Sequence, residues 1–433
     1  MVPAPDDAPA QPIFIRPNAL PVAEVAAEGA EEDIIELELV EETPAPEPQA
    51  LSPPPDPPRE IVLLGAGHAH LQIVTWWRGR PIPNARLTLV SAFDRAAYSG
   101  MLAGVIAGKF QPEDMLIDLP RLCDRCGVQL VVDRAIALHP AARRIELAHQ
   151  PALVFDAASI NIGSVPGQEP LWQSRRMLLA VKPMATFWQR FQTRLQELLA
   201  QWRDAGEHRR LQLVIVGAGA GGTEVALCLE ERIHNEELPI DVHLVDAADN
   251  VWRGASAGAV ARVRKLLKYR GIELHLGQAI VDCDEDGPSV LVLADGSRLR
   301  CDLAIWTTGA TPPVAVQAYS LPRSPGGFLQ VDRTFRVSPD MPVFATGDIA
   351  DFPQPLPKSS EEAIRQAPVL WHNLHATLRS EPMKIYEPKS TALTLLACGD
   401  GTAILDYHGW SVRSRWSWWL KCLRDSKFLR RLR

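Results

Sequence analysis

The feature that most constrains this 433-residue chain is a complete glycine motif, Gly217-x-Gly219-x-x-Gly222, with Asp246 following it. The motif joins an apolar segment to a helix-forming one, and Asp246 ends the next apolar segment. The first glycine permits a tight turn, the second lets a pyrophosphate approach the backbone, and the third allows close helix–strand packing. A carboxylate at the Asp246 position accepts from a ribose 2′-hydroxyl and repels a 2′-phosphate. The motif therefore predicts NADH binding in preference to NADPH.

A shorter version of this motif stands about 150 residues earlier, as Gly65-x-Gly67-x-x-His70 after the apolar segment 61–64. His70 takes the place of the third glycine, and Ser91 stands where an acidic residue is expected at the end of the second strand. By itself this loop is equally consistent with an ordinary strand-to-helix turn. Amides at a helix N-terminus after such a loop bind phosphates.

Histidines follow this first loop directly. We expect His68 to lie next to the phosphates, together with Ala69 at the helix start, and His70 to be a packing residue. The two histidines do not converge on one metal ion, and no second CxxC accompanies Cys123 and Cys126, so we expect no metal site. We interpret the two cysteines as structural, because they follow Leu119-Pro120 at a predicted helix start and form an isolated CxxC.

The repeated strand–loop–helix–strand pattern predicts an α/β fold with two Rossmann-like, three-layer domains. A long amphipathic helix between the two copies would bridge them. The predicted strands are 61–64, 86–90, 211–216 and 241–245, and the predicted helices are 184–201, 223–234 and one starting at His68.

Two later strands complete a recognisable pattern, 302–312 (DLAIWTTGATP) and 341–349 (MPVFATGDI). With the two glycine loops they resemble the two-dinucleotide flavoproteins of the pyridine nucleotide–disulfide oxidoreductase superfamily. The resemblance implies FAD at the first loop and NADH at the second, and it implies that Asp348 bonds the flavin ribityl chain. Gly309 and Gly347 fall in these two strands, and Gly163 falls in the similarly matching segment 160–166 (INIGSVP). All three are expected to contact the cofactors.

The resemblance also implies domain boundaries. The flavin domain would be split into residues 59–205 and 312–380, with the NAD(H) domain inserted at 206–311. Residues 381–433 would form a C-terminal Trp-rich, basic segment.

Within the superfamily, the chain resembles the type II NADH dehydrogenase-like branch, through GAGHAHLQIV, AYSGMLAGVIAG and IRQAPVLWHNL. Its nearest resemblance there is to the flavoprotein domain fused to selenide, water dikinase. No CxxxxC pair follows Gly65, which excludes a disulfide reductase. The resemblance implies that Glu224 faces the nicotinamide–flavin site and that Gln366 lies beside the flavin ring and quinone pocket. A second glutamine typical of that pocket has no match, and Glu361 stands near its place.

Composition separates the ends of the chain from its centre. Residues 1–58 carry a net charge of −12 and fourteen of the 37 prolines, which leaves residues 59–433 at +5 within the overall −7. Such an acidic, proline-rich segment cannot bury enough apolar surface to fold alone, so we predict a disordered tail. Seven scattered cysteines, no secretory signal and no apolar run of about 18 residues favour a cytoplasmic protein.

The C-terminal residues 410–433 contain four tryptophans and eight Lys or Arg but one acid, Asp425. A helix lying on the inner membrane surface, a helix packed on the flavin domain and a homodimer interface are all open interpretations. Nucleic-acid binding is not expected, because the basic cluster is short.

Together these patterns predict an FAD-dependent NADH dehydrogenase that passes electrons to a quinone or another small acceptor. The alternative is a redox-sensing or scaffold flavoprotein with little turnover, linked to selenium metabolism.

Overall fold

The computed structural model describes residues 57–433 apart from 168–174, 207, 286–288 and 389–392. The predicted disordered tail thus lies almost wholly outside the described residues.

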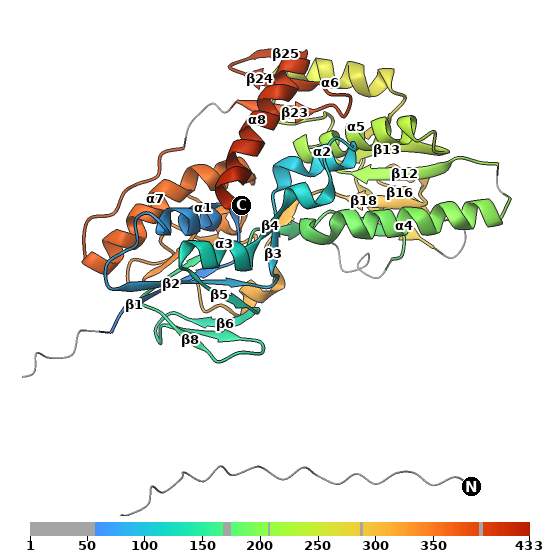
Figure 1. Ribbon diagram of the computed structural model, residues 1–433. Coiled ribbons are helices and arrows are strands. Elements are labelled where there is room, and N and C mark those ends of the chain that lie inside the picture. Colours follow the sequence, from blue (N-terminus) through green and yellow to red (C-terminus); the bar gives the residue numbers. More distant parts are fainter. Residues whose placement is uncertain (1–56, 168–174, 207, 286–288, 389–392) are drawn as a thin grey trace, which may run out of the picture. The chain divides into compact units, whose positions relative to one another are not determined.

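A five-stranded parallel sheet forms around the first glycine loop, in the order β21-β9-β1-β2-β5. Residues 61–64 of its central strand are almost completely buried, as expected for a parallel strand covered on both faces. Helices α1 (His68–Trp77), α3 (Leu119–Cys126) and α7 (Ser360–Arg379) accompany this sheet, and α1 packs against both other helices (Figure 1). The strands are β1 (Arg59–Leu64), β2 (Ala85–Ser91), β5 (Gln129–Val132), β9 (Ala157–Ile160) and β21 (Val343–Ala345).

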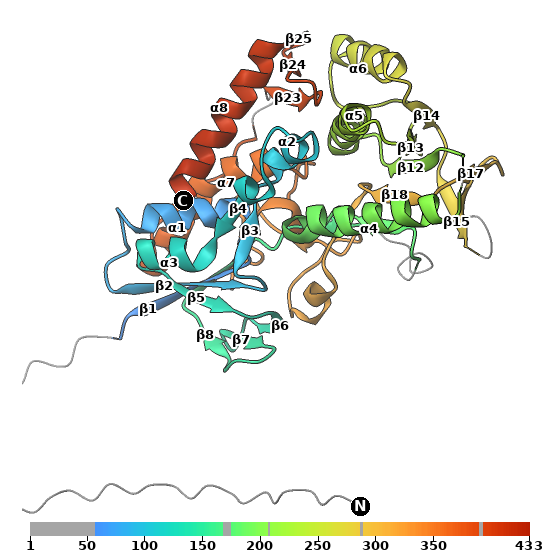
Figure 2. The same cartoon turned by 45° about the vertical axis from the view of Figure 1, so that its right-hand side comes forward.

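A second five-stranded parallel sheet forms around the second glycine loop, in the order β11-β18-β12-β13-β14. Helices α4 (Met184–Asp204), α5 (Ala220–Asn235) and α6 (Ala257–Tyr269) belong to this half of the chain (Figure 2). The strands are β11 (Leu178–Ala180), β12 (Leu211–Val216), β13 (Ile240–Asp246), β14 (Glu273–Leu276) and β18 (Leu303–Trp306).

The two sheets share one topology. In each sheet, the strand before the glycine loop (β1 or β12) lies between the next strand in sequence (β2 or β13) and a strand from later in the chain (β9 or β18). A three-stranded antiparallel sheet precedes that later strand in the sequence. That antiparallel sheet is β6 (Ala135–His139), β7 (Arg144–Leu147) and β8 (Leu153–Val154) in the first unit. It is β15 (Ile280–Asp284), β16 (Val290–Leu293) and β17 (Arg298–Arg300) in the second. The predicted α/β class with two Rossmann-type units is confirmed.

One detail differs from the predicted boundaries. Strand β11 lies inside the segment 59–205 expected for the flavin domain, yet it pairs with β18 of the second sheet. The chain therefore enters the second sheet before α4. The pattern of residues 178–180 is too short to show which sheet they join.

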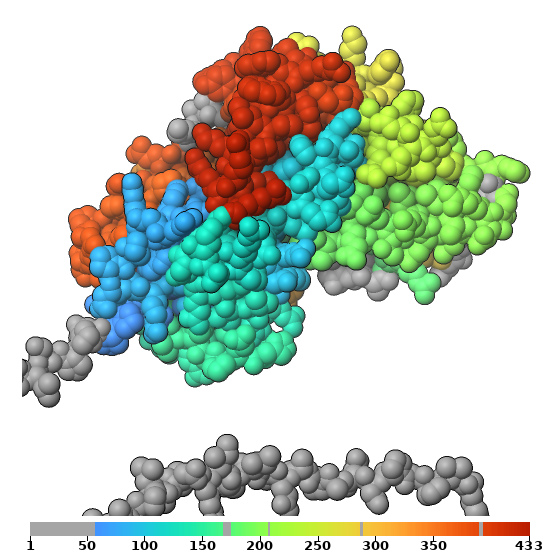
Figure 3. Space-filling view, viewed as in Figure 1, coloured from blue at the N-terminus to red at the C-terminus, as the bar shows by residue number. Residues whose placement is uncertain are grey.

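The C-terminal residues form an antiparallel sheet and a last helix, α8 (Arg415–Leu432). The sheet contacts α5 and α6, whereas α8 also reaches α1, so this segment touches both units. Figure 3 shows the red C-terminal residues against the cyan segment near residue 100, where Lys421 Nζ donates to the Gly100 carbonyl at 2.9 Å. The sheet strands are β23 (Thr394–Ala397), β24 (Ala403–Tyr407) and β25 (Trp410–Ser414).

Short elements connect these parts. They are β3 (Arg95–Ala97), η1 (Ser99–Met101), α2 (Leu102–Ile106), η2 (Pro112–Met115), β4 (Leu116–Asp118), β10 (Val165–Pro166), β19 (Ala310–Thr311), η4 (Val314–Ala318), β20 (Leu329–Gln330), η5 (Gly347–Ile349) and β22 (Ala350–Asp351).

Candidate active site

The first glycine loop turns sharply between β1 and α1. Gly65 has φ +92°, a left-handed conformation that L side chains rarely adopt. A Cβ on Gly67 would lie 2.0 Å from Asn161 Oδ1, so only glycine fits there. Helix α1 begins at His68, and its N-cap residue Gly67 has no capping side chain. Asn161 takes the Ala69 amide, and the other amides at this helix start face the position where a loop of this kind binds an anion.

Asn161 holds this loop to the rest of the first sheet. Its Oδ1 accepts from the Ala69 amide at 3.2 Å, and its Nδ2 donates to the Thr346 carbonyl at 2.6 Å. The amide thus joins the start of α1 to the end of β21, next to Gly347. Asn161 was not among the predicted site residues, although it stands beside Gly163 in the segment that carried the resemblance.

A polar cluster lies next to this loop. Asp348 Oδ2 accepts from the Ser164 hydroxyl at 2.8 Å and from Lys182 Nζ at 3.1 Å. Lys182 also donates to the Ser164 hydroxyl oxygen at 2.8 Å. Asp348 was predicted, whereas Lys182 and Ser164 were not, because their role depends on segments more than 160 residues apart in sequence.

The two histidines of the first loop have different surroundings. His68 lies against the rings of Tyr98 and Phe428, and its Nε2 is buried with no hydrogen-bond partner among the described residues. Burial lowers the pKa of His68 to about 4, with Asp348 opposing and Lys182 adding to the shift, so the ring is neutral at pH 7. A neutral imidazole beside the polar cluster fits a ligand that offers it a hydrogen bond.

His70, by contrast, is a satisfied core residue. Its Nδ1 lies 2.7 Å from the Gly65 carbonyl oxygen and its Nε2 2.8 Å from the Ser159 hydroxyl. Burial lowers the pKa of His70 to about 4 as well, so the residue stays uncharged. Ser91 also bonds locally, because its hydroxyl donates to the Phe93 carbonyl at 2.7 Å.

The second glycine loop has the geometry of a dinucleotide site. Gly217 has φ +111°, and a Cβ on Gly222 would lie 1.8 Å from the Gly217 carbonyl oxygen, whereas no atom lies within 4 Å of a Cβ at Gly219. The space beside Gly219 is the position where a pyrophosphate approaches such a loop. Asp246 Oδ2 accepts from the Ala218 amide at 2.5 Å, which orients the carboxylate toward the loop.

The carboxyl ends of the two sheets meet. The segment after β9 passes Gly163 into β10, and the segment after β18 passes Gly309 into β19. Strands β10 and β19 pair antiparallel, and the Gly167 amide donates to the Gly309 carbonyl at 2.8 Å. Because ligands of open α/β sheets bind at the carboxyl ends of the strands, two nucleotides on these loops would approach each other here.

Glu224, on α5 directly after the second loop, belongs to a buried chain of polar groups. Its Oε1 accepts from the Ala397 amide at 2.7 Å and lies 3.7 Å from Lys421 Nζ of α8. Lys421 Nζ lies 3.5 Å from Asp425 Oδ2, and Asp425 Oδ1 accepts from the Tyr98 hydroxyl at 2.8 Å. This series of polar contacts connects the two units through α8.

The charges in this chain are coupled. Burial raises the pKa of Glu224 and the Lys421 ammonium lowers it, with burial the larger effect. Burial lowers the pKa of Lys421, but the Glu224 and Asp425 carboxylates outweigh burial and leave it raised. Lys421 is therefore charged at neutral pH, and Glu224 gains a proton more readily than an exposed glutamate.

Gln366 lies on α7 beside a small cavity. Its Oε1 accepts from the Gly347 amide at 2.7 Å. The cavity, about 160 Å³, is lined by Gly347, Gln366 and residues that include Phe335, Phe352 and Lys358. Glu362, one helical turn before Gln366, is buried and accepts from the Tyr386 hydroxyl at 2.6 Å.

Glu362 thus lies on the Gln366 side of the helix, one position after Glu361, the residue that stands near the place of the missing glutamine. Glu361 lies farther out, and its carboxylate pairs with Arg365 and Arg424.

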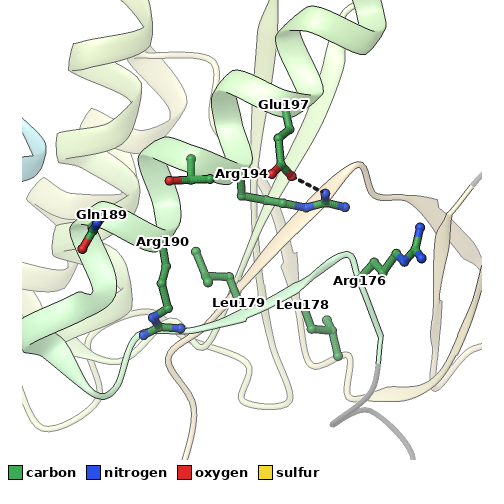
Figure 4. A pocket seen from close by; sticks show the side chains of 8 residues that line it. Arg176, Leu178, Leu179, Gln189, Arg190, Arg194 and Glu197 are labelled. Atoms are coloured by element: carbon green, nitrogen blue, oxygen red, sulfur yellow. Dashed lines mark hydrogen bonds and ion pairs between the residues drawn. The ribbon is translucent and has the colours of Figure 1, made fainter. Parts of the chain in front are cut away.

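A larger cavity, about 340 Å³, lies between β11 and α4, and none of the predicted site residues lines it (Figure 4). Arg176, Arg190 and Arg194 line it, but Arg194 is paired with Glu197 at 2.8 Å. Arg190 donates to the Ala180 and Pro183 carbonyls, so its guanidinium ties α4 to the preceding segment. Two of the three arginines at this cavity, Arg190 and Arg194, therefore have partners within the protein.

Cys123 and Cys126 lie buried on α3. Burial, with Cys126 adding to it, raises the pKa of Cys123 to about 12, so its thiol is not reactive at neutral pH.

Helix α8 is amphipathic. Its buried face contains Lys421 and Asp425, whereas Trp416, Trp419 and Leu423 are exposed. Among the described residues, no helix combines the length and apolarity that crossing a membrane requires.

Comparison with known proteins agrees with this geometry. Residues 59–367 match the pyridine nucleotide-disulphide oxidoreductase family. A type II NADH:quinone oxidoreductase of Staphylococcus epidermidis is 22% identical over 390 residues, covering 86% of this chain and 96% of that protein.

Solved structures share the fold. The sulfide:quinone oxidoreductase of Aquifex aeolicus aligns with a TM-score of 0.73 at 16% identity, covering 87% of this chain and 91% of that one. NDH2 of Plasmodium falciparum aligns with a TM-score of 0.72 at 12% identity, covering 85% and 98%. The narrower resemblance to a selenide, water dikinase fusion domain stays a prediction.

Proposed function

The chain belongs to the pyridine nucleotide-disulphide oxidoreductase family, and we propose that it is an FAD-dependent NADH dehydrogenase that reduces a quinone. FAD would bind at the first glycine loop and NADH at the second. The observation that carries this proposal is the meeting of the two sheets at their carboxyl ends through β10 and β19, each sheet with a glycine loop at that end.

The residues around the first loop fit a flavin nucleotide. The loop amides and the uncapped start of α1 would hold the pyrophosphate. Asp348, held by Lys182 and Ser164, would accept from a ribityl hydroxyl, and the unpartnered Nε2 of His68 would gain a hydrogen bond. Gly163 and Gly347 would line the same site.

The second loop fits NADH better than NADPH. The Asp246 carboxylate accepts from the Ala218 and Ala248 amides, and each oxygen keeps a lone pair for a ribose hydroxyl. A 2′-phosphate would meet the negative charge of the Asp246 carboxylate, and the residue as a whole is 8% exposed. Gly309 would border the nicotinamide end.

Bound FAD would supply the chemistry of accepting a hydride from NADH and passing on its electrons, and the protein would supply position and electrostatics. Glu224 and Lys421 would set the charge near the meeting point of the nucleotides, where Glu224 can hold a proton and Lys421 balances its carboxylate. No acid or base is required for hydride transfer itself.

The acceptor is proposed from the cavity beside Gln366 and from the relatives named type II NADH:quinone oxidoreductase. Phe335 and Phe352 provide apolar walls, and Lys358 and Gln366 provide polar groups for a quinone oxygen. Glu362, which stands in place of a glutamine one turn before Gln366, does not line this cavity, because its carboxylate binds the Tyr386 hydroxyl.

A visible spectrum before and after NADH addition tests the cofactors. Yellow protein bleached by NADH, and far less by NADPH, is the expected result. A colourless protein that takes up no added flavin would refute the proposal. Steady-state NADH oxidation with a soluble quinone, ferricyanide or oxygen then tests the acceptor, and turnover below about 0.01 s⁻¹ with all three would favour a sensing role, because enzymes typically turn over near 10 s⁻¹.

We also propose that α8 contacts a membrane surface through Trp416, Trp419 and Leu423. Tryptophan beside basic residues is typical of helices at anionic lipid surfaces. Co-sedimentation with anionic vesicles should weaken when Trp416 and Trp419 are changed to Ser. The exposed Tyr269 on α6, changed to Ser, is the matched control. Unchanged co-sedimentation of the double variant, with dimerisation lost, would instead assign the helix to a homodimer interface.

A further inference from the structure

Three potential metal ligands meet on the second sheet, on strands β13 and β14, which lie side by side (Figure 2). His243 is directly opposite Glu273 in the parallel register, and His275 follows Glu273 by two residues. Side chains alternate along a strand and paired residues share a face, so all three project from the same face. None of the three belongs to the proposed nucleotide sites.

The ligand atoms have the spacing of a tetrahedral zinc site. His243 Nδ1 lies 3.2 Å from His275 Nε2 and 3.3 Å from Glu273 Oε2. His275 Nε2 and Glu273 Oε2 are 4.0 Å apart. Ligands about 2.0–2.1 Å from Zn²⁺ in a tetrahedron lie about 3.3 Å from one another. Only Glu273, whose side chain is 64% exposed, needs to move slightly.

Gln212 prepares His243 for such a role. Its Oε1 lies 2.6 Å from His243 Nε2, and its Nε2 donates to the Arg210 carbonyl and to Asp241 Oδ2. Because those two partners are both acceptors, the Gln212 oxygen must face the imidazole, and His243 Nε2 must donate to it. The lone pair of His243 is then on Nδ1, which points to His275 and Glu273. Metal-binding histidines commonly donate their other ring N–H to a neighbour in this way.

We propose that His243, His275 and Glu273 bind a divalent transition-metal cation, with Zn²⁺ the best match. Two imidazoles and one carboxylate suit zinc, whereas Mg²⁺ and Ca²⁺ prefer oxygen ligands. Since β14 is the edge strand of the sheet, the ion would clamp it to β13, the strand that ends at Asp246. The proposal is independent of the proposed catalytic function.

Isothermal titration of the chelator-treated full chain with ZnCl₂ tests the site. We expect His275→Ala and Glu273→Gln each to weaken zinc binding about 10–100-fold or more, since even loss of a second-shell partner costs that much. His234→Ala, an exposed histidine on α5, should leave the affinity unchanged, and MgCl₂ should give no comparable binding. Zinc should also raise the Tm of the wild type but not of His275→Ala, because a ligand of the folded state stabilises it.

Both ligand variants change partly exposed side chains of an edge strand, so we expect both proteins to fold and their zinc affinities to be comparable with that of the wild type. Equal zinc affinity in the wild type and in both ligand variants would overturn the proposal, and so would magnesium binding as tight as zinc binding. An unchanged wild-type Tm at saturating zinc would refute the proposal that the ion stabilises the pairing of β14 with β13.

Discussion

Removing the charge of Lys421 should destabilise the protein in a pH-dependent manner. The ammonium lies 3.7 Å from Glu224 Oε1 and 3.5 Å from Asp425 Oδ2, and its side chain is only 10% exposed. Lys421→Met keeps most of the side-chain volume but leaves both carboxylates without their cation. Breaking a buried ion pair by deleting one partner costs about 3–5 kcal/mol.

The lower end of that range applies here. Glu224 keeps the Ala397 amide as a donor, and Asp425 keeps the Tyr98 hydroxyl. We therefore expect the free energy of unfolding to fall by about 3 kcal/mol at pH 8.

The sign of the pH dependence follows from Glu224. Burial already raises its folded-state pKa above the usual 4.5, and loss of Lys421 raises it further. A raised carboxyl pKa favours the folded state at low pH, where the group is protonated in both states, and this contribution is lost as the pH rises through the folded pKa. The penalty of Lys421→Met should thus be smaller at pH 5 than at pH 8.

Urea denaturation at several pH values measures this effect. Lys427→Met changes an exposed lysine on the same helix and is the matched control. It should lower the free energy of unfolding by less than about 1 kcal/mol, as surface substitutions usually do. Adding Glu224→Gln to Lys421→Met should restore part of the lost stability, which a double-mutant cycle reports. A loss no larger than that of Lys427→Met, or one that is equal at pH 5 and pH 8, would refute the coupling.

Three further predictions concern the glycine loops. Asp246→Arg should lower the ratio of kcat/KM for NADH to that for NADPH at least about tenfold. A tenfold change corresponds to only about 1.4 kcal/mol, a small difference for replacing a carboxylate by a cation beside a 2′-phosphate. An unaltered ratio would refute the ribose assignment. Gly222→Ala should weaken NADH binding, measured by titration, while the flavin stays bound, because its Cβ would lie 1.8 Å from the Gly217 carbonyl oxygen. Gly221→Ala, whose Cβ meets no atom within 4 Å, is its control, and equal NADH affinity in both variants would contradict the packing argument. The wild-type free energy of unfolding should fall as the pH drops from 6.5 toward 4, because the folded pKa of His70 is lowered to about 4 and the unfolded chain binds the proton first. In His70→Gln, the slope of the free energy of unfolding against pH should correspond to about one bound proton fewer. An identical slope in the variant would show that His70 does not cause the decline.

The elements beside the second glycine loop could be predicted within a few residues, and the predicted helix 223–234 lies within α5. The expected strand 211–216 coincides with β12, and the predicted strand 241–245 lies within β13. The expected helix 184–201 begins at the first residue of α4. These elements depend on local rules, because an apolar run, a left-handed glycine and a helix period act over a few residues.

The first loop was harder to interpret from residues alone. His70 replaces a glycine there, and only the tertiary structure shows how it fits, between the Gly65 carbonyl and the Ser159 hydroxyl of β9. The family resemblance, and not the local pattern, pointed to FAD.

What the chain determined by itself is therefore its pair of glycine loops, the strands and helices beside them, and the acidic residue that ends β13. Only the folded structure decided that Lys421 meets Glu224, that Asn161 joins α1 to the end of β21, and that His243 faces His275. Those contacts join residues 32 to 197 positions apart, and no local pattern encodes them because strand order and helix packing bring them together. Short-range backbone preferences are written along the sequence, whereas buried charge pairs and ligand clusters exist only after the sheets have assembled.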